Sequence, residues 1–179
     1  MNLDLILKLE SLSKKLRKAF GLVIDKDNFS DFKQISFEEL SACIQEAFPQ
    51  IKIQDTIVDD TYMIKCYDDA GIDGSQNDFF EIYLKKQNIE LLMHEVAHIL
   101  FHNQDVPYNV PIGMNLGTWE QEIEANYFSR AFLIPEEYFI KALSLFSRND
   151  GTVDLDNFAN RFNVQNRMIV ERGRDLKIW

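Results

Sequence analysis

All three histidines of this 179-residue chain lie in one short segment, "MHEVAHILFHN", which spans residues 93–103. They recur at every fourth position, as His94, His98 and His102, and Glu95 directly follows the first of them. The positions between them are mostly apolar, and the apolar pattern begins upstream, so we expect one largely buried helix over residues 88–102. Such a helix brings imidazole and carboxylate groups into the interior of the fold, where polar groups need partners.

His94 and His98 have the spacing of two ligands that share one metal ion. On a helix they lie about 40° apart around the axis and about 6 Å apart along it, so both imidazoles can reach the same ion. Glu95 lies about 100° around from His94 and flanks the ion, where it can take a proton from the water that attacks a carbonyl. This His-Glu-x-x-His pattern predicts zinc (Zn2+) as the cofactor and Glu95 as the general base. The alternative is a core helix with incidental histidines, which would bury a carboxylate without a cation.

His102 is predicted to have a different role from the other two histidines. If the helix continues, it lies about 12 Å along the axis from His94, which is too far to share the ion. We expect it either to interact with carbonyls at the helix end or to contact a residue that binds the metal.

A catalytic zinc needs a third protein ligand and an open position. The helix predicted over residues 119–134 offers Glu120, Glu122 and Glu124. Glu120 fits an ordinary acidic helix start. Glu122 and Glu124 lie about 200° apart around the helix, so we expect only one of them to face the zinc helix, and the spacing leaves both open. If Glu122 is the ligand, Asn126 lies one turn further on and can hydrogen-bond a ligand histidine.

The order of patterns along the chain predicts an α+β fold. Three strand patterns precede the zinc helix, and helical patterns occupy both ends of the chain. We expect a small, mainly antiparallel sheet packed against the zinc-binding helix, with a helical N-terminus and a C-terminal helix pair. The strands are predicted over residues 51–58, 61–67 and 78–84, and the other helices over residues 5–20, 36–48, 136–146, 153–162 and 165–176.

The charge balance is acidic, with 19 Lys and Arg against 29 Asp and Glu and a net charge of -10. That balance disfavours binding to nucleic acid or anionic lipid, which needs cationic surface. The closing segment 153–179 carries five basic and four acidic side chains, so we expect no direct nucleic-acid binding from it. Without a signal-peptide pattern, a disulfide framework or an apolar run of membrane-spanning length, we expect a cytoplasmic protein that does not enter membranes.

Two motifs, "HEVAHILFH" and "EIEANYFSRAFLIP", together resemble the ImmA/IrrE family of zinc metallopeptidases. Members of that family show His-Glu-x-x-His and then Glu-x-x-Ala-Asn-x-Phe-Ala-x-x-Leu-Leu-x-Pro. In this chain the second motif begins at Glu122, with Ser129 in place of the usual Ala and Phe132 in place of the usual Leu. The resemblance covers roughly residues 50–175 and is specific across the two motifs. It implies Glu122 as the third ligand, in the gluzincin manner, with Asn126 as its companion.

The resemblance also implies a division of the chain and an activity. We predict a helical N-terminal segment at residues 1–49, a zincin-like metallopeptidase core at 50–150, and a C-terminal helix pair at 151–179 packed on that core. The implied activity is zinc-dependent endopeptidase cleavage of a protein substrate, a DNA-binding repressor of a phage, mobile element or stress regulon. The alternative is a non-proteolytic zinc-containing interaction module, as in a toxin–antitoxin or regulator pair.

Two further expectations concern the substrate cleft. In gluzincins an edge strand holds the substrate extended through main-chain hydrogen bonds, and we expect "DFFEIYL" at residues 78–84 to be that strand. Tyr108 and Tyr127 are the candidate donors to the oxyanion, and the sequence does not choose between them.

Overall fold

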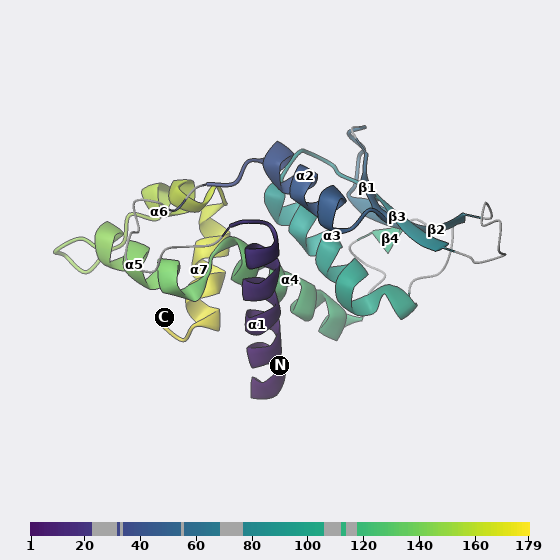
Figure 1. The fold of residues 1–179 in the computed structure, drawn as a ribbon. Coiled ribbons are helices and arrows are strands. Elements are labelled where there is room, and N and C mark those ends of the chain that lie inside the picture. Colours follow the sequence, from purple (N-terminus) through teal and green to yellow (C-terminus); the bar gives the residue numbers. More distant parts are fainter. Residues whose placement is uncertain (23–31, 33, 55, 69–76, 106–111, 114–117) are drawn as a thin grey trace. The chain divides into compact units, whose positions relative to one another are not determined.

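The computed structural model describes residues 1–22, 32, 34–54, 56–68, 77–105, 112–113 and 118–179 (Figure 1). Contacts divide the chain into two compact units, which are described separately. The sheet unit is Phe37–Asn126, and the helical unit combines Met1–Ser36 with Tyr127–Trp179. The three-part division predicted from the sequence, with boundaries after residues 49 and 150, remains a prediction.

The sheet unit contains strands β1 to β4 and the helix that carries the histidines. Its first helix, α2, begins directly after Ser36 and confirms the helix predicted over residues 36–48. The elements in chain order are α2 (Phe37–Ala47), β1 (Ile51–Ile53), β2 (Tyr62–Asp68), β3 (Asn77–Tyr83), α3 (Ile89–His102), the 3-10 turn η2 (Asn103–Asp105), β4 (Ile112–Gly113) and the first half of α4 (Trp119–Leu133).

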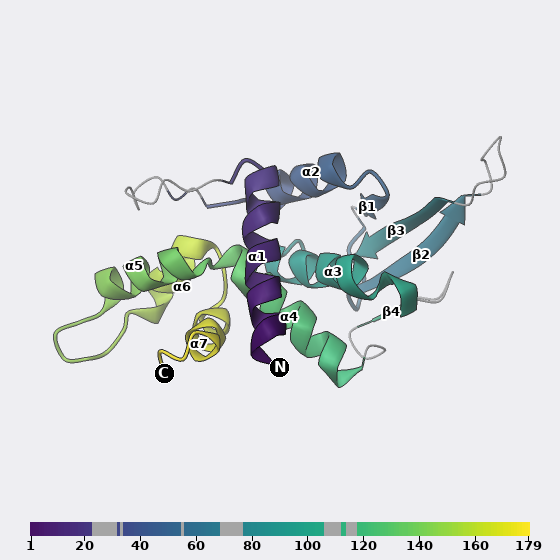
Figure 2. The same ribbon diagram turned by 60° about the horizontal axis from the view of Figure 1, so that its bottom comes forward.

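The described strands form one mixed sheet in the order β1-β3-β2-β4. β2 pairs antiparallel with β3 and with β4, and β1 pairs parallel with β3. The prediction of a small, mainly antiparallel sheet is therefore confirmed, with one parallel pair added. Figure 2 shows β2 and β3 running side by side as its two long strands.

The prediction that residues 78–84 form an edge strand is wrong. β3 is an inner strand, because β1 and β2 occupy its two sides. Phe80 and Ile82 of β3 are buried. The alternation of apolar and polar residues along a strand indicates which face of the sheet is buried. It does not indicate how many strands pair with it.

Helix α3 packs against the sheet through β3, and α2 packs against β1 (Figure 1). The side chain of Asn88 caps the start of α3 by accepting from the backbone N–H groups of Glu90 and Leu91, at 2.8 and 3.1 Å. Apolar side chains then bury most of the helix, including Leu92, Met93 and Val96. This packing holds the histidine-bearing face of α3 at a defined rotation.

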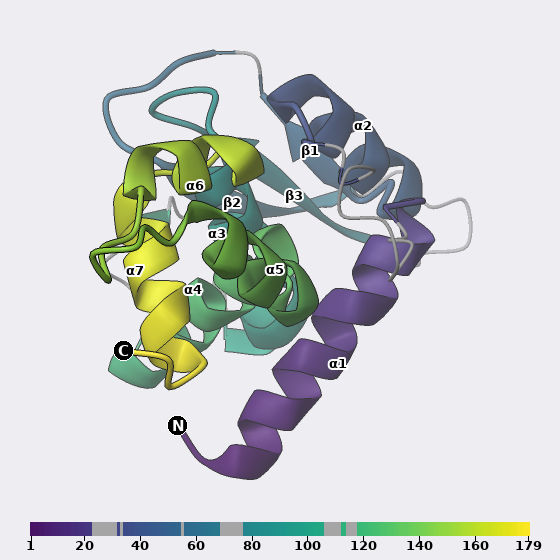
Figure 3. The same ribbon diagram turned by 90° about the vertical axis from the view of Figure 1, so that its left-hand side faces the viewer.

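The helical unit confirms the predicted helical N-terminus and C-terminal helix pair. It contains α1 (Leu3–Ala19), the second half of α4, α5 (Glu136–Phe146), α6 (Leu155–Phe162) and α7 (Asn166–Asp175). Helices α6 and α7 pack on each other, as Figure 3 shows, and α5 packs on α6. Asn163 makes the turn between α6 and α7 in the left-handed conformation, with φ 57°, which asparagine tolerates better than most residues.

Two details of the strands differ from the sequence predictions. β1 ends at Ile53, before residue 58, although the backbone N–H groups of Gln54 and Val58 still donate to the carbonyls of Ile82 and Leu84. β4 was not predicted. The segment between β2 and β3, residues 69–76, lies outside the described residues. Within the parts of the chain that the structure describes, every helix is too short or too polar to span a bilayer.

Candidate metal centre

His94 and His98 bring their imidazoles together on one face of α3. Their Nε2 atoms are 3.1 Å apart, and their ring centroids are 4.7 Å apart. The two residues are 4% and 7% exposed, so this contact is largely removed from water. The i, i+4 spacing produces the pairing directly, because such residues are neighbours on a helix surface.

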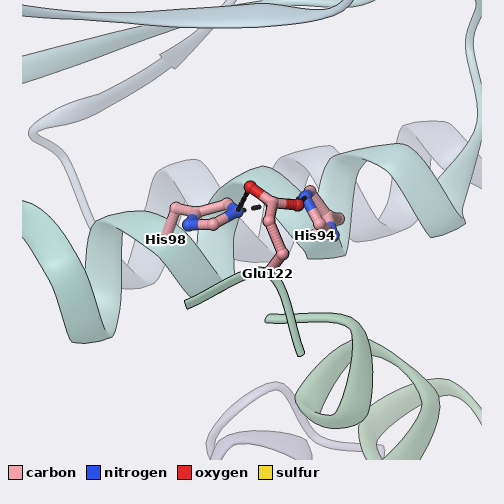
Figure 4. Close-up of side chains that lie close together, drawn as sticks. All are labelled: His94, His98 and Glu122. Carbon is pink, nitrogen blue, oxygen red and sulfur yellow. Dashed lines mark hydrogen bonds and ion pairs between the residues drawn. The ribbon is translucent and has the colours of Figure 1, made fainter. Parts of the chain in front are cut away.

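Glu122 reaches both imidazoles from α4. Its Oε2 lies 3.3 Å from Nε2 of His94, and its Oε1 lies 3.3 Å from Nε2 of His98. Figure 4 shows the carboxylate between the two rings. One ligand atom from each of the three residues can be chosen so that all lie within 4.8 Å of one another. Two imidazole nitrogens and a carboxylate oxygen are the ligand set of a catalytic zinc site with an open position.

A capping box, in which two residues three apart exchange hydrogen bonds, forms the start of α4. The hydroxyl of Thr118 accepts from the backbone N–H of Gln121 at 3.3 Å, and the Gln121 side chain accepts from the backbone N–H of Thr118 at 2.8 Å. Glu122 therefore follows immediately after a defined helix start. Glu120 is exposed, in keeping with an ordinary acidic first turn.

Asn126 lies against His94, as the sequence predicted. Its Nδ2 donates to the backbone carbonyl of Glu122 at 2.8 Å, and its Oδ1 faces Nδ1 of His94 at 3.2 Å. Because the amide oxygen can only accept, Nδ1 of His94 is the donor. A neutral His94 then keeps its lone pair on Nε2, the atom that faces Glu122 and His98. The donor set therefore fits a cation better than it fits a closed hydrogen-bond network.

Glu124, the alternative third ligand, contacts a different histidine. Its Oε2 lies 3.2 Å from Nε2 of His102. The expectation that only one of the two carboxylates could face α3 is wrong, because both reach histidines of that helix. A glutamate side chain is long enough to reach around its own helix, so angular spacing alone does not decide the contact. Of the two roles expected for His102, the structure supports contact with a residue that could bind the metal. Nδ1 of His102 lies 3.2 Å from Nδ1 of His98.

Comparison with known families bears on the same segment. The family model described as the IrrE N-terminal-like domain, a peptidase family, matches residues 85–173, which include α3 and α4. This chain belongs to the ImmA/IrrE family. The predicted resemblance is thereby confirmed, and the family supports a metallopeptidase-type function acting on a protein substrate. No curated protein matches the sequence.

In this ImmA/IrrE-family site, the carboxylates next to the histidines stabilise a positive charge at the cluster. Burial alone would lower the pKa of His94, but its hydrogen bond with Glu122 and the charges of Glu95 and Glu122 raise the pKa above its ordinary value. Burial would raise the pKa of Glu122, and contact with His94 and His98 lowers it to about 2. Both directions describe a cluster that stabilises either a proton or a metal cation.

Glu95 is a buried carboxyl, 3% exposed, next to His94 in sequence. Burial raises its pKa to about 7; the charge of His94 opposes that shift, and the charge of Glu122 adds to it. A nearby divalent cation would favour the ionised form. A carboxyl whose proton affinity lies near neutral pH suits proton exchange with a substrate.

Of the two tyrosines considered for the oxyanion, the structure describes only Tyr127, whose hydroxyl has a partner within its own unit. The hydroxyl of Tyr127 donates to Oε1 of Glu10 at 2.7 Å within the helical unit. Tyr108 lies outside the described residues.

Proposed function

We propose that this chain is a zinc-dependent endopeptidase, gluzincin-like, in which His94, His98 and Glu122 hold the metal. The observation that carries the proposal is the convergence of two imidazole nitrogens and one carboxylate from two separate helices, within 4.8 Å of one another. Membership of a metallopeptidase family supports the same conclusion. Zinc fits the mixed nitrogen and oxygen ligand set better than calcium or magnesium, which prefer oxygen ligands throughout.

Glu95 and Asn126 have different proposed roles beside the metal ligands. When bound, zinc polarises the scissile carbonyl and lowers the pKa of water. Glu95 is the proposed general base: its carboxylate accepts a proton from the attacking water and returns it to the leaving nitrogen of the peptide. Asn126 holds His94 with its Nε2 toward the cluster, through the contact with Nδ1 at 3.2 Å.

The proposed substrate is a DNA-binding repressor of a phage, mobile element or stress regulon, cleaved in the cytoplasm. Repressors carry basic DNA-binding surfaces. The net charge of -10 on this chain would attract such a partner and raise the rate of encounter. The same charge argues against direct nucleic-acid binding.

The test combines metal content with cleavage of a purified repressor encoded beside the gene for this chain. We expect wild type to bind one zinc and cleave the repressor, and Glu122→Gln to lose zinc. Glu95→Gln is expected to keep zinc and lose at least about 100-fold in cleavage rate, the low end of general-base effects. Glu120→Gln, in the exposed first turn of α4, is the matched control and should behave as wild type.

Three results would each contradict a part of the proposal. Zinc-loaded wild type that leaves the repressor intact argues against repressor cleavage, and a zinc-dependent complex with an uncleaved partner would favour the interaction-module alternative. Full cleavage by Glu95→Gln would remove Glu95 from the role of general base.

A further inference from the structure

His98 has a neighbour on each side of its ring. Its Nε2 faces the candidate metal position, with Glu122 Oε1 at 3.3 Å, and its Nδ1 lies 3.2 Å from Nδ1 of His102. A neutral imidazole carries one N–H and one lone pair. The contact between the two Nδ1 atoms is therefore a hydrogen bond only if one ring donates and the other accepts.

Glu124 determines the direction of that bond. Its Oε2 lies 3.2 Å from Nε2 of His102, and an ionised carboxylate can only accept. Neutral His102 therefore carries its proton on Nε2 and has its lone pair on Nδ1. His98 must then donate from Nδ1, which leaves the lone pair of His98 on Nε2.

The opposite arrangement is incompatible with metal binding. If His102 donated from Nδ1, His98 would accept at its own Nδ1. Neutral His98 would then carry its proton on Nε2, directed at the position where the cation must lie. The pair formed by Glu124 and His102 thus selects the one tautomer of His98 that can bind a metal.

We propose that Glu124 and His102 are positioning residues that fix the tautomer and ring orientation of His98, as a relay from the carboxylate through one imidazole to the next. The proposal rests on the proposed function, because it takes His98 as a ligand through Nε2. Asn126 serves His94 in the corresponding way, so each candidate histidine ligand has its own partner. His98 and His102 are both buried, which strengthens the hydrogen bond between them relative to one in water.

The proposal gives Glu122 and Glu124 of α4 different roles in metal binding. Glu122 would contact the cation, and Glu124 would act on the cation only through two rings. Loss of a partner behind a metal ligand typically weakens metal binding by about 10- to 100-fold, whereas loss of a ligand costs more. Zinc affinity can therefore separate the two roles.

The first test measures zinc affinity by competition with a chromogenic chelator. We expect Glu124→Ala and His102→Leu each to weaken zinc binding by about 10- to 100-fold. The double variant should be no weaker than His102→Leu alone, because both changes interrupt the same chain of bonds. His102→Gln should restore most of the affinity, since its amide oxygen can accept from Nδ1 of His98. Glu120→Ala is the control on the same helix and should change nothing.

The second test reads the tautomers directly by nitrogen-15 NMR of the zinc-loaded full chain. We expect His98 to be protonated on Nδ1 and bound through Nε2, and His102 to be neutral and protonated on Nε2. A His102 protonated only on Nδ1 would overturn the proposal. This measurement needs no variant, so it decides the question even if His102→Leu fails to fold.

The ligand set and the relay can be overturned by different results. Wild type without zinc binding, or zinc bound without loss in Glu122→Gln, would overturn the ligand set itself. Zinc bound through His98 and Glu122, with unchanged affinity in both Glu124→Ala and His102→Leu, would overturn the relay alone. Strictly additive losses in the double variant would also overturn it.

Discussion

Each of the two units buries a polar cluster, and the two clusters balance their charges differently. In the helical unit, Arg172 donates to Glu10 at 2.7 Å and to the backbone carbonyl of Ile134 at 3.0 Å, while Tyr127 donates to the same Glu10 oxygen. This cluster contains both a cation and an anion.

In the sheet unit, Glu122 pairs with His94 and His98, which are cationic only when protonated. The hydrogen bond from His94 to Asn126 leaves a lone pair directed at the cluster centre. A buried cluster that holds its own cation stabilises the fold, whereas one that directs lone pairs at a common point is arranged to bind a cation.

The largest expected effect is in the self-neutralised cluster. Arg172 is fully buried, and Arg172→Met would leave Glu10 with its carboxylate near the interior and without its cationic partner. We expect the free energy of unfolding to fall by about 3–5 kcal/mol. Chemical denaturation measures it, with the exposed Arg174→Met on the same helix as the control. Loss of less than about 1 kcal/mol would show that the ion pair is not structural.

The second largest effect is expected on zinc affinity, at the cluster of His94, His98 and Glu122. His98→Ala should weaken zinc binding by more than about 100-fold, beyond the loss typical of a residue behind a ligand. The metal-free protein should lose stability as well, because His98 contacts Glu122 and His102 without a cation, and the loss should be larger when zinc is bound. Thermal unfolding with and without a chelator measures both quantities. A chelator that lowers the midpoint of His98→Ala as much as that of wild type would contradict the distinction between the clusters.

A smaller effect is expected at the partner of the other histidine. Asn126→Ala removes the acceptor for Nδ1 of His94 and should weaken zinc binding by about 10-fold, the lower end for such partners because Asn126 is exposed. Asn126→Asp keeps an acceptor and should retain the affinity. Chelator competition measures both variants. Equal losses in the two would show that the amide acts by shape and not by accepting this bond.

The smallest effect is expected at the start of α4. Thr118→Ala removes the cap on the backbone N–H of Gln121 and should cost about 1 kcal/mol of stability. Because Glu122 follows in the same turn, zinc binding should weaken by a few-fold at most. Denaturation and chelator competition on one preparation compare the two losses. A loss of zinc affinity as large as that of His98→Ala would mean that the helix start, and not the ligand set, limits binding.

The sequence alone was sufficient for the local parts of this site. The spacing of His94 and His98 predicted their pairing, because neighbours on a helix surface are set by backbone geometry and need no tertiary information. The helix predicted over residues 119–134 begins where expected for the same reason, since the capping box of Thr118 and Gln121 joins residues only three apart. The family motif added Glu122, and the structure brings its carboxylate to both histidines.

The sequence did not predict the contacts between elements that are far apart in the chain. Nothing in the pattern of residues 78–84 indicated an inner strand, since the neighbours of a strand depend on sheet assembly and not on its own alternation. The pairing of Glu124 with His102, across two helices, and the burial of Arg172 against Glu10 were likewise absent from the periodicity.

Sequence by itself determined which residues share a helix face, where several helices begin, and that one helix carries a metal-binding pattern. Tertiary structure decided which acidic side chain joins each histidine, which nitrogen of each ring is left to face the cluster, and which strand lies inside the sheet. The physical reason is that helix geometry repeats over a few residues and is encoded locally. Hydrogen-bond direction in a buried cluster depends on every group packed around it, and those groups come together only in the folded chain.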